Sequence, residues 1–228
     1  MSRTQEIRQL LLLDTDTVRL QAGEQLHVCD NLTALHEHMA ASILADIEAH
    51  QERGARLILP VGPTGQYPLL AEKIKARELS LAGCRFFFMD EYCDEAGKSL
   101  PETHPLSFKR VAHEQFLNLL PDDCEIEDAM VIFPDESNIT ELSDMMQADG
   151  GLDACYGGIG IHGHVAFNEP EAGVKSSTAR KVRLNDFTIT INAIRAGVGG
   201  NLPGFPREAY TVGLEDILQA RRIRLYCR

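Results

Sequence analysis

Residues 56–65 read RLILPVGPTG, and this stretch decides the fold class of the chain. The apolar run Arg56–Val61 predicts a short strand, and the GPTG segment that follows breaks it before a helical stretch over residues 68–77. Because nearly every position of the run is apolar, the pattern is typical of a strand in a parallel sheet that is covered on both faces.

The same alternation of strand and helix continues along the chain. Apolar residues at three- and four-residue steps predict a helix that begins behind Asp30 as its N-cap and ends near Gly54. Further strands are predicted at residues 84–89, 129–133 and 152–156. Further helices are predicted over residues 106–120 and 139–148. This order predicts an α/β fold, a single Rossmann-like domain over residues 1–228 with a central, mostly parallel sheet flanked by helices.

Composition narrows the class of protein. The chain has 228 residues, of which 44% are hydrophobic and 25% charged, as in an ordinary globular domain. Its 22 Lys and Arg against 34 Asp and Glu give a net charge of −12, which opposes binding to nucleic acid or anionic membranes. We expect a cytoplasmic protein, because no run is long enough to span a bilayer and no secretory signal is evident. Six scattered cysteines without a CxxC pair predict neither disulfides nor a metal cluster.

Unusual residues follow three of the predicted strands. In parallel α/β sheets, ligands bind beyond the carboxyl ends of the strands. Thr64 and Gly65 precede a helix whose free N–H groups could hold a phosphate, although the segment could also be a simple tight turn. Asp90 follows an apolar strand that could raise its pKa and make it a proton carrier, although it could also be a solvated or helix-capping acid.

Residues 157–170 read GGIGIHGHVAFNEP and are the most informative segment. His162 and His164 have the His-x-His spacing of a metal pair, but no third ligand of matching type is evident. General acid–base chemistry by a histidine, with Glu169 as its electrostatic partner, is therefore the favoured interpretation.

These segments resemble the glucosamine-6-phosphate deaminase family, whose wider group includes 6-phosphogluconolactonases. The PTGQYP segment at residues 63–68 keeps four of six positions of the family's PTGGTP, and FMDEY at 88–92 matches its NMDEY. HPLSF at 104–108 and YTVG at 210–213 also match, and residues 157–170 keep the family signature with one loss. Lactonases usually carry DER in place of DEY, so the resemblance favours the deaminases.

The resemblance implies a cofactor-free aldose–ketose isomerisation of an amino-sugar 6-phosphate with loss of ammonia. Asp90 would move a proton between C2 and C1 of the sugar. His164 would assist ring opening, with Glu169 as its charged neighbour. Arg195 is the residue that best matches the family's phosphate-binding arginine, although its spacing in the sequence is off by one residue. The residues implied in phosphate binding are Thr64, Gly65, Gln66 and Arg195.

The chain departs from the family pattern at two places. His162 stands where the family has an aspartate two residues before the catalytic histidine, so a carboxylate that would orient His164 is missing. Residues 221–228 resemble the strand that in the family precedes a phosphate-binding lysine. We therefore expect that lysine, together with the family's C-terminal strand and helices, to be missing.

Three functions stay open at this point. The first is a deaminase of the family, the second an isomerase or lactonase acting on another hexose phosphate, and the third a non-catalytic sugar-phosphate-binding protein. All three predict a small-molecule sugar phosphate as the partner, with neither nucleic acid nor membrane, and leave a homo-oligomer open.

Overall fold

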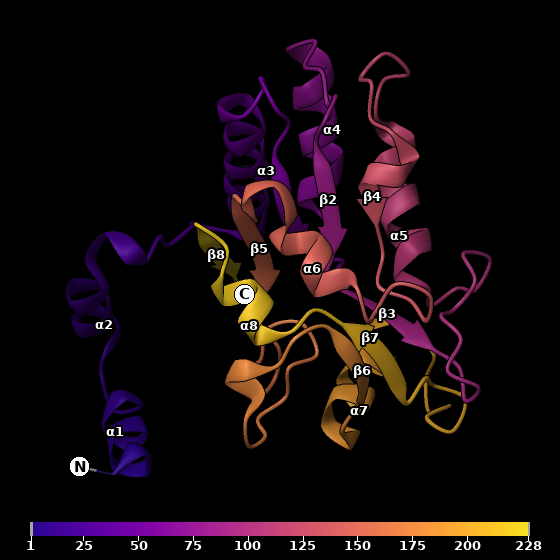
Figure 1. The fold of residues 1–228 in the computed structure, drawn as a ribbon. Coiled ribbons are helices and arrows are strands. Elements are labelled where there is room, and N and C mark those ends of the chain that lie inside the picture. The colour runs from indigo at the N-terminus through magenta and orange to yellow at the C-terminus, as the bar shows by residue number, and fades with distance from the viewer. Residues whose placement is uncertain (1, 228) are drawn as a thin grey trace. The chain divides into compact units, whose positions relative to one another are not determined.

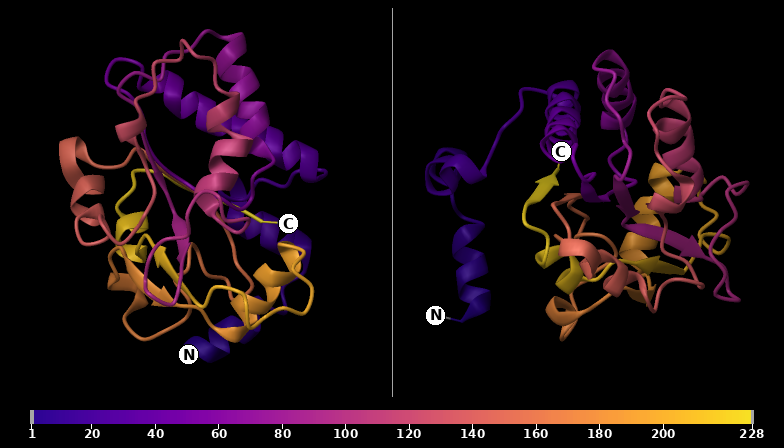
Figure 2. Two further views of the ribbon diagram at one scale, coloured as in Figure 1. Left: turned by 90° about the vertical axis from the view of Figure 1, so that its right-hand side faces the viewer. Right: turned by 45° about the horizontal axis from the view of Figure 1, so that its top comes forward.

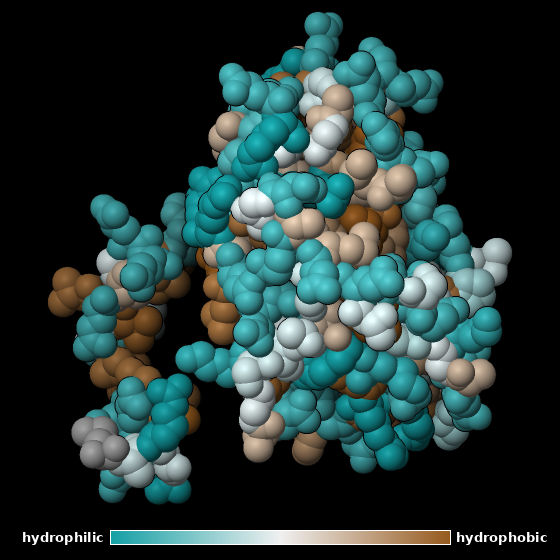
Figure 3. Space-filling view, in the orientation of Figure 1, coloured by the Kyte–Doolittle hydropathy of each residue, from teal (hydrophilic) through white to brown (hydrophobic). Residues whose placement is uncertain are grey.

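A computed structural model describes residues 2–227 of the chain, which divides into two compact units at residues 35 and 36 (Figure 1). The first unit contains helices α1 (Arg3–Leu10) and α2 (Thr15–Ala22), followed by the short 3-10 helix η1 (Gly23–Gln25). Neither α1 nor α2 buries a residue. Apolar side chains are accordingly visible on the surface of this unit in Figure 3.

A parallel five-stranded sheet forms the centre of the second unit. Its strand order is β4-β2-β1-β5-β8, and each neighbouring pair runs parallel. The α/β fold class with a central parallel sheet is thus confirmed. The strands are β1 (Arg56–Leu59), β2 (Arg85–Phe88), β4 (Val131–Ile132), β5 (Ala154–Gly158) and β8 (Ile223–Tyr226).

Helices cover both faces of this sheet. On one face, Phe86 and Phe88 of β2 contact Tyr67 of α4 and Phe116, which follows α5. The hydroxyl of Tyr156 in β5 donates to Ser42 O of α3 on the same face. Figure 2 shows α3, α4 and α5 side by side. On the other face, α6 and α8 bury apolar side chains against β1, β2 and β5. The helices are α3 (Leu32–Ala49), α4 (Gln66–Ala76), α5 (Phe108–Gln115), α6 (Leu142–Gln147) and α8 (Leu214–Leu218).

Several predicted boundaries are wrong at the helix ends. Asn31, not Asp30, caps α3, because its Oδ1 accepts a hydrogen bond of 2.9 Å from Ala34 N. The same helix ends at Ala49 rather than near Gly54. Gly54 has a positive φ and lies in a turn, where its N–H donates to His50 O. The helix predicted over residues 106–120 is shorter, since α5 ends at Gln115 and a 3-10 turn follows.

A second, antiparallel sheet was not predicted. It has the order β3-β7-β6, formed by β3 (Asp90–Cys93), β7 (Glu208–Thr211) and β6 (Arg180–Arg183). Helix α7 (Asp186–Arg195) follows β6, and the apolar cluster under this sheet includes Tyr92, Phe167 and Phe205. The pair Asp90-Glu91 therefore begins a strand of its own instead of lying in a loop. Among residues 2–227, no helix has the length and apolarity needed to cross a membrane.

Candidate active site

Two glycine-rich strand ends meet at the carboxyl edge of the parallel sheet. A Cβ atom on Gly158, at the end of β5, would lie 2.8 Å from Gly62 O and 3.3 Å from Pro63 Cδ. The loops after β1 and β5 can approach this closely because Gly158 carries no side chain. Beside this contact lies a cavity of about 120 Å3, lined by Pro60, Val61, Gly62, Met89, Asp90, Phe108, Gly158, Ile159, Gly160, His164, Ala166, Phe167, Asn192 and Arg195.

Asp90 has its carboxylate in this cavity at the start of β3. Its Oδ1 accepts hydrogen bonds from Thr211 Oγ1 at 2.5 Å and from Phe167 N at 3.2 Å. Burial raises the pKa of Asp90 from 3.8 to about 7, although these two donors act in the opposite direction. A carboxyl group with such a pKa can both accept and return a proton near neutral pH.

Glu91, the next residue, stabilises the fold by accepting hydrogen bonds at the start of α5. Its carboxylate accepts hydrogen bonds from Ser107 Oγ at 2.9 Å, Phe108 N at 3.0 Å and Lys109 N at 2.8 Å, at the start of α5. Burial raises the pKa of Glu91, and these donors oppose that shift. Because Phe108 lines the cavity, Glu91 helps to position one wall of the site.

His164 also lines the cavity. A Cβ atom on Gly160 would lie 2.0 Å from His164 Nε2, so the imidazole packs where a side chain would otherwise be. Its Nδ1 is buried and has no hydrogen-bond partner among the described residues. Burial lowers the pKa of His164; Glu169 raises it in part, whereas His162 and Arg195 lower it. The imidazole is therefore held by packing rather than by a carboxylate.

His162 does not replace the missing carboxylate as a partner of His164. The centres of the two rings are 5.8 Å apart, and His162 Nε2 lies 3.2 Å from Asn185 Oδ1. Asn185 Oδ1 also accepts from Thr188 N, so it is an acceptor and His162 Nε2 carries the proton. Phe187 contacts the His162 ring edge-on.

Glu169 and Asn168 hold the segment that surrounds the cavity. Both carboxylate oxygens of Glu169 accept from Asn185 N, the N-cap residue of α7, at 3.1 and 3.3 Å. The Asn168 amide donates to Val165 O and Val212 O and accepts from Arg180 at 2.7 Å. Glu169 thus acts on His164 through its charge while it fixes the start of α7.

Of the four residues implied in phosphate binding, only one lines the cavity. Arg195, at the end of α7, lines the cavity despite its shifted spacing in the sequence. The lining from the loop after β1 comes from Pro60, Val61 and Gly62, whereas Thr64 lies next to it and is partly buried. The side chain of Gln66 is fully buried, and its Nε2 donates to Pro63 O at 2.7 Å. At Gly65, a Cβ atom would meet the His36 ring.

Thr211, Asn192 and Ala166 belong to the site but were not predicted. Thr211 lies opposite Asp90 in the β3–β7 pairing, which no local pattern reveals. Its position within the YTVG segment was the one available signal. Ala166 has φ of 54°, a value that non-glycine residues rarely adopt, and it directs Phe167 N towards Asp90.

The fold and the site together define an α/β protein with a desolvated aspartate and a histidine at the strand ends, suited to proton transfer on a small molecule. Sequence comparison is more specific. The chain is 32% identical to a glucosamine-6-phosphate deaminase of Caenorhabditis elegans over 208 residues, which cover 88% of this chain and 74% of the relative. It is 31% identical to glucosamine-6-phosphate deaminase 2 of Mus musculus, over 88% of this chain and 72% of the relative. The chain belongs to the glucosamine-6-phosphate deaminase family.

Solved structures agree with this assignment. A monomeric glucosamine-6-phosphate deaminase superimposes with a TM-score of 0.74 and 25% identity, over 86% of this chain and 79% of that one. A 6-phosphogluconolactonase from Thermotoga maritima gives a TM-score of 0.61 at 17% identity, over 84% of this chain and 78% of that one, and shares the fold alone. No family model matches the chain. The relatives are thus enzymes of sugar-phosphate chemistry, and lactonases fit less well than deaminases.

Proposed function

We propose that this chain converts an amino-sugar 6-phosphate of the glucosamine-6-phosphate type into the ketose phosphate and ammonia, without a cofactor. Family membership supports the reaction class. The observation that carries the proposal for this chain is the Asp90 carboxyl group, whose pKa burial raises to about 7 inside a cavity that His164 also lines.

The first step is opening of the sugar ring. A proton has to reach the ring oxygen while another leaves the C1 hydroxyl, and His164 is the neutral base and acid available at the cavity. Burial lowers the pKa of His164, so the imidazole is mostly neutral near pH 7 and can accept a proton before it donates one.

The second step is proton transfer within the open-chain sugar. Ionised Asp90 takes the proton from C2, and the protonated carboxyl returns it to C1. Meanwhile the C1 aldehyde oxygen gains a proton and the C2 amine loses one, so that C1 becomes a CH2OH group and the amine becomes an imine. Water then adds to the imine, and ammonia leaves to give the ketone. Thr211 Oγ1 and Phe167 N donate to one oxygen of Asp90, so the group is held in place while its protonation changes.

Arg195 and the loop around Thr64 are the proposed phosphate ligands. Arg195 offers a guanidinium group at the cavity, and the amides at the start of α4 add N–H donors. A crystal soaked with phosphate should show the anion within hydrogen-bond distance of these groups. An anion bound only elsewhere would contradict this part of the proposal.

The decisive experiment is a panel of hexose and hexosamine 6-phosphates assayed for ammonia release and for isomerisation. Ammonia from an amino-sugar phosphate, lost in Asp90→Asn and kept in Asp123→Asn, would support the proposal; Asp123 is an exposed loop residue and a matched control. Isomerisation or lactone hydrolysis of another hexose phosphate without ammonia release would contradict it. Binding without turnover would favour a non-catalytic sugar-phosphate-binding protein.

The proposal also includes a cytoplasmic location and leaves a homo-oligomer as a hypothesis. All six cysteines are free, which suits a reducing compartment. One solved relative is described as monomeric, so light scattering on the purified chain is the appropriate test of its oligomeric state.

A further inference from the structure

Tyr92 lies directly behind the wall of the candidate active site. It is the third residue of β3, is only 3% exposed and does not itself line the cavity. The centre of its ring is 4.6 Å from that of Phe108 and 5.6 Å from that of Phe167, and both of these rings line the cavity. Packing explains the buried ring, but a phenylalanine would pack in the same way, so the buried hydroxyl group needs a separate explanation.

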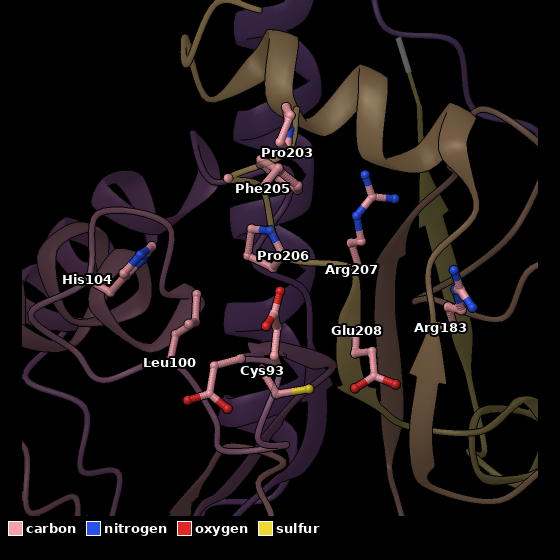
Figure 4. A pocket seen from close by; sticks show the side chains of 12 residues that line it. Cys93, Leu100, His104, Arg183, Pro203, Phe205, Pro206, Arg207 and Glu208 are labelled. Carbon is pink, nitrogen blue, oxygen red and sulfur yellow. The ribbon is translucent and has the colours of Figure 1, made fainter. Parts of the chain in front are cut away.

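A third aromatic ring also holds Tyr92 in place. Phe205 contacts the Tyr92 ring edge-on, with 5.4 Å between the ring centres. Leu100 and Phe205 belong to the same apolar cluster as Tyr92, and both line a separate cavity of about 470 Å3, in whose wall Figure 4 shows them. The two cavities share no lining residue. Tyr92 therefore packs against walls of both, and the position of its hydroxyl group is fixed by the surrounding rings.

The hydroxyl group of Tyr92 reaches helix α7. Burial and the nearby charge of Asp90 raise the pKa of Tyr92, so the phenol is protonated at neutral pH. A hydrogen bond with the Asn192 side chain and the positive charge of Arg195 act in the opposite direction. The hydroxyl group thus lies next to the part of α7 that carries Arg195.

Asn192 connects this hydroxyl group to the face of α7 that lines the candidate active site. Asn192 and Arg195 both line the cavity, and residues three apart in a helix are neighbours on one face. Ile189 and Ala193 of the same helix are buried in the apolar cluster that contains Tyr92. Such apolar contacts hold α7 against the cluster but are not directional, whereas a hydrogen bond is. The bond to Asn192 therefore fixes which way this face of α7 points.

Strand β3 relates this contact to the proposed proton carrier. Asp90 and Tyr92 are two residues apart in the strand, so their side chains lie on the same face. One short strand thus carries both the carboxylate in the cavity and the hydroxyl group that contacts α7. The separation between Asp90 and Arg195 consequently depends on Tyr92. A substrate that reacts at one end and is bound by its phosphate at the other requires that separation to match its length.

We propose that Tyr92 is a positioning residue for the phosphate end of the substrate. Its hydroxyl group, acting through Asn192, holds Arg195 at the cavity at a fixed distance from Asp90. The inference rests on the proposed function, in which Arg195 binds the 6-phosphate of an amino sugar. Tyr92 acts on substrate binding rather than on the proton transfer, because the two hydrogen-bond donors to Asp90 do not involve it.

The test compares Tyr92→Phe with Tyr210→Phe, because each variant keeps the ring and removes only a hydroxyl group. Tyr210 is a matched control: it is 5% exposed, lies on the neighbouring strand β7, donates to Gly97 O and does not line the cavity. Tyr92→Phe should raise KM for glucosamine 6-phosphate at least fivefold and leave kcat within twofold of wild type. The Kd from calorimetric titration should rise by the same factor, and Tyr210→Phe should match wild type in all three constants.

A double-mutant cycle with Arg195→Gln separates positioning from a merely structural role. Because the hydroxyl group acts through Arg195, adding Tyr92→Phe to Arg195→Gln should change Kd less than twofold. A structural role would weaken binding equally in both backgrounds. A full fivefold effect in the Arg195→Gln background, or equal constants for Tyr92→Phe and Tyr210→Phe, would overturn the proposal.

Two readouts distinguish failure of this inference from failure of the proposed function. If wild type releases no ammonia but its Kd responds to Tyr92→Phe and not to Tyr210→Phe, the reaction is contradicted and the positioning role is supported. Amide hydrogen exchange needs no substrate, and residues 192–195 should exchange at least threefold faster in Tyr92→Phe than in Tyr210→Phe. Equal exchange rates would overturn the proposal. Asn192→Ala removes the partner of the hydroxyl group and should give the same rise in Kd if Tyr92→Phe does not fold.

Discussion

Asp90→Asn should remove turnover and at the same time stabilise the fold, by an amount that grows with pH. An amide keeps the oxygen that accepts from Thr211 and Phe167, but it has no charge to bury. In wild type, burial raises the pKa of Asp90 from 3.8 to about 7. Because the folded pKa is the higher one, wild type loses stability as pH rises from 3.8 to 7, and above 7 the loss is complete.

The size of the effect follows from the same two pKa values. A shift of about three units corresponds to roughly 4 kcal/mol at pH 8, where the carboxylate is ionised in both states. At pH 5 the group is still protonated in the folded state, and the cost is only about 2 kcal/mol. The stability gain of Asp90→Asn should therefore be roughly 2 to 3 kcal/mol larger at pH 8 than at pH 5.

Urea unfolding of wild type, Asp90→Asn and Asp123→Asn at pH 5 and pH 8 measures this difference. Asp123 is an exposed loop residue, so its variant should follow wild type at both pH values. A difference of 2 kcal/mol corresponds to roughly 4 to 8 °C in Tm for a chain of this size, so thermal melts provide a second readout. Equal stability of Asp90→Asn and wild type at both pH values would refute the argument that Asp90 is desolvated.

Three further outcomes follow from the site. His162→Asp should raise deaminase turnover about tenfold, which corresponds to about 1.4 kcal/mol of transition-state stabilisation. It should also shift the pH profile of turnover upwards, because a nearby carboxylate raises the pKa of His164, and unchanged or slower turnover would count against this prediction. Gly160→Ala should lower turnover at least about tenfold while phosphate binding is kept, because the new Cβ displaces the His164 ring; normal kinetics would disprove that packing. Glu91→Ala should lower the free energy of unfolding by roughly 2 to 4 kcal/mol in urea, as the N–H donors at the start of α5 lose their acceptor, and a neutral result would exclude that role.

The parallel sheet was predictable because its signal is local. Strands β1, β2, β4 and β5 each lie in a short apolar run, and the helices between them have apolar residues at helical spacing. Strand β8, with the sequence IRLY, was indicated only by the family resemblance. Asp90 could also be selected from the sequence, since it directly follows such a run. The wrong ends of the helices have the same physical origin, because a cap depends on which neighbouring side chain reaches the first N–H groups, and here Asn31 does so instead of Asp30.

The antiparallel sheet was not predictable, because its three strands are distant in sequence and lack alternating patterns. Asp90 lies 121 residues from Thr211, yet their side chains form a 2.5 Å hydrogen bond. The motif that contains Thr211 was recognisable, but its contact with Asp90 arises only when β7 pairs with β3. The same holds for Glu91, whose partners at the start of α5 lie 16 to 18 residues further on.

The two adjacent carboxylates on β3 should make the candidate active site intolerant of a one-residue insertion or deletion in this strand. Successive side chains of a strand point to opposite faces, so Asp90 faces the cavity while Glu91 faces α5. Deletion of Met89 would shift the strand by one residue, so that Glu91 would take the place of Asp90 at the cavity and α5 would lose its acceptor. Point substitutions can change this site one property at a time, whereas a one-residue shift of β3 would remove both the proposed proton carrier and the support of the cavity wall.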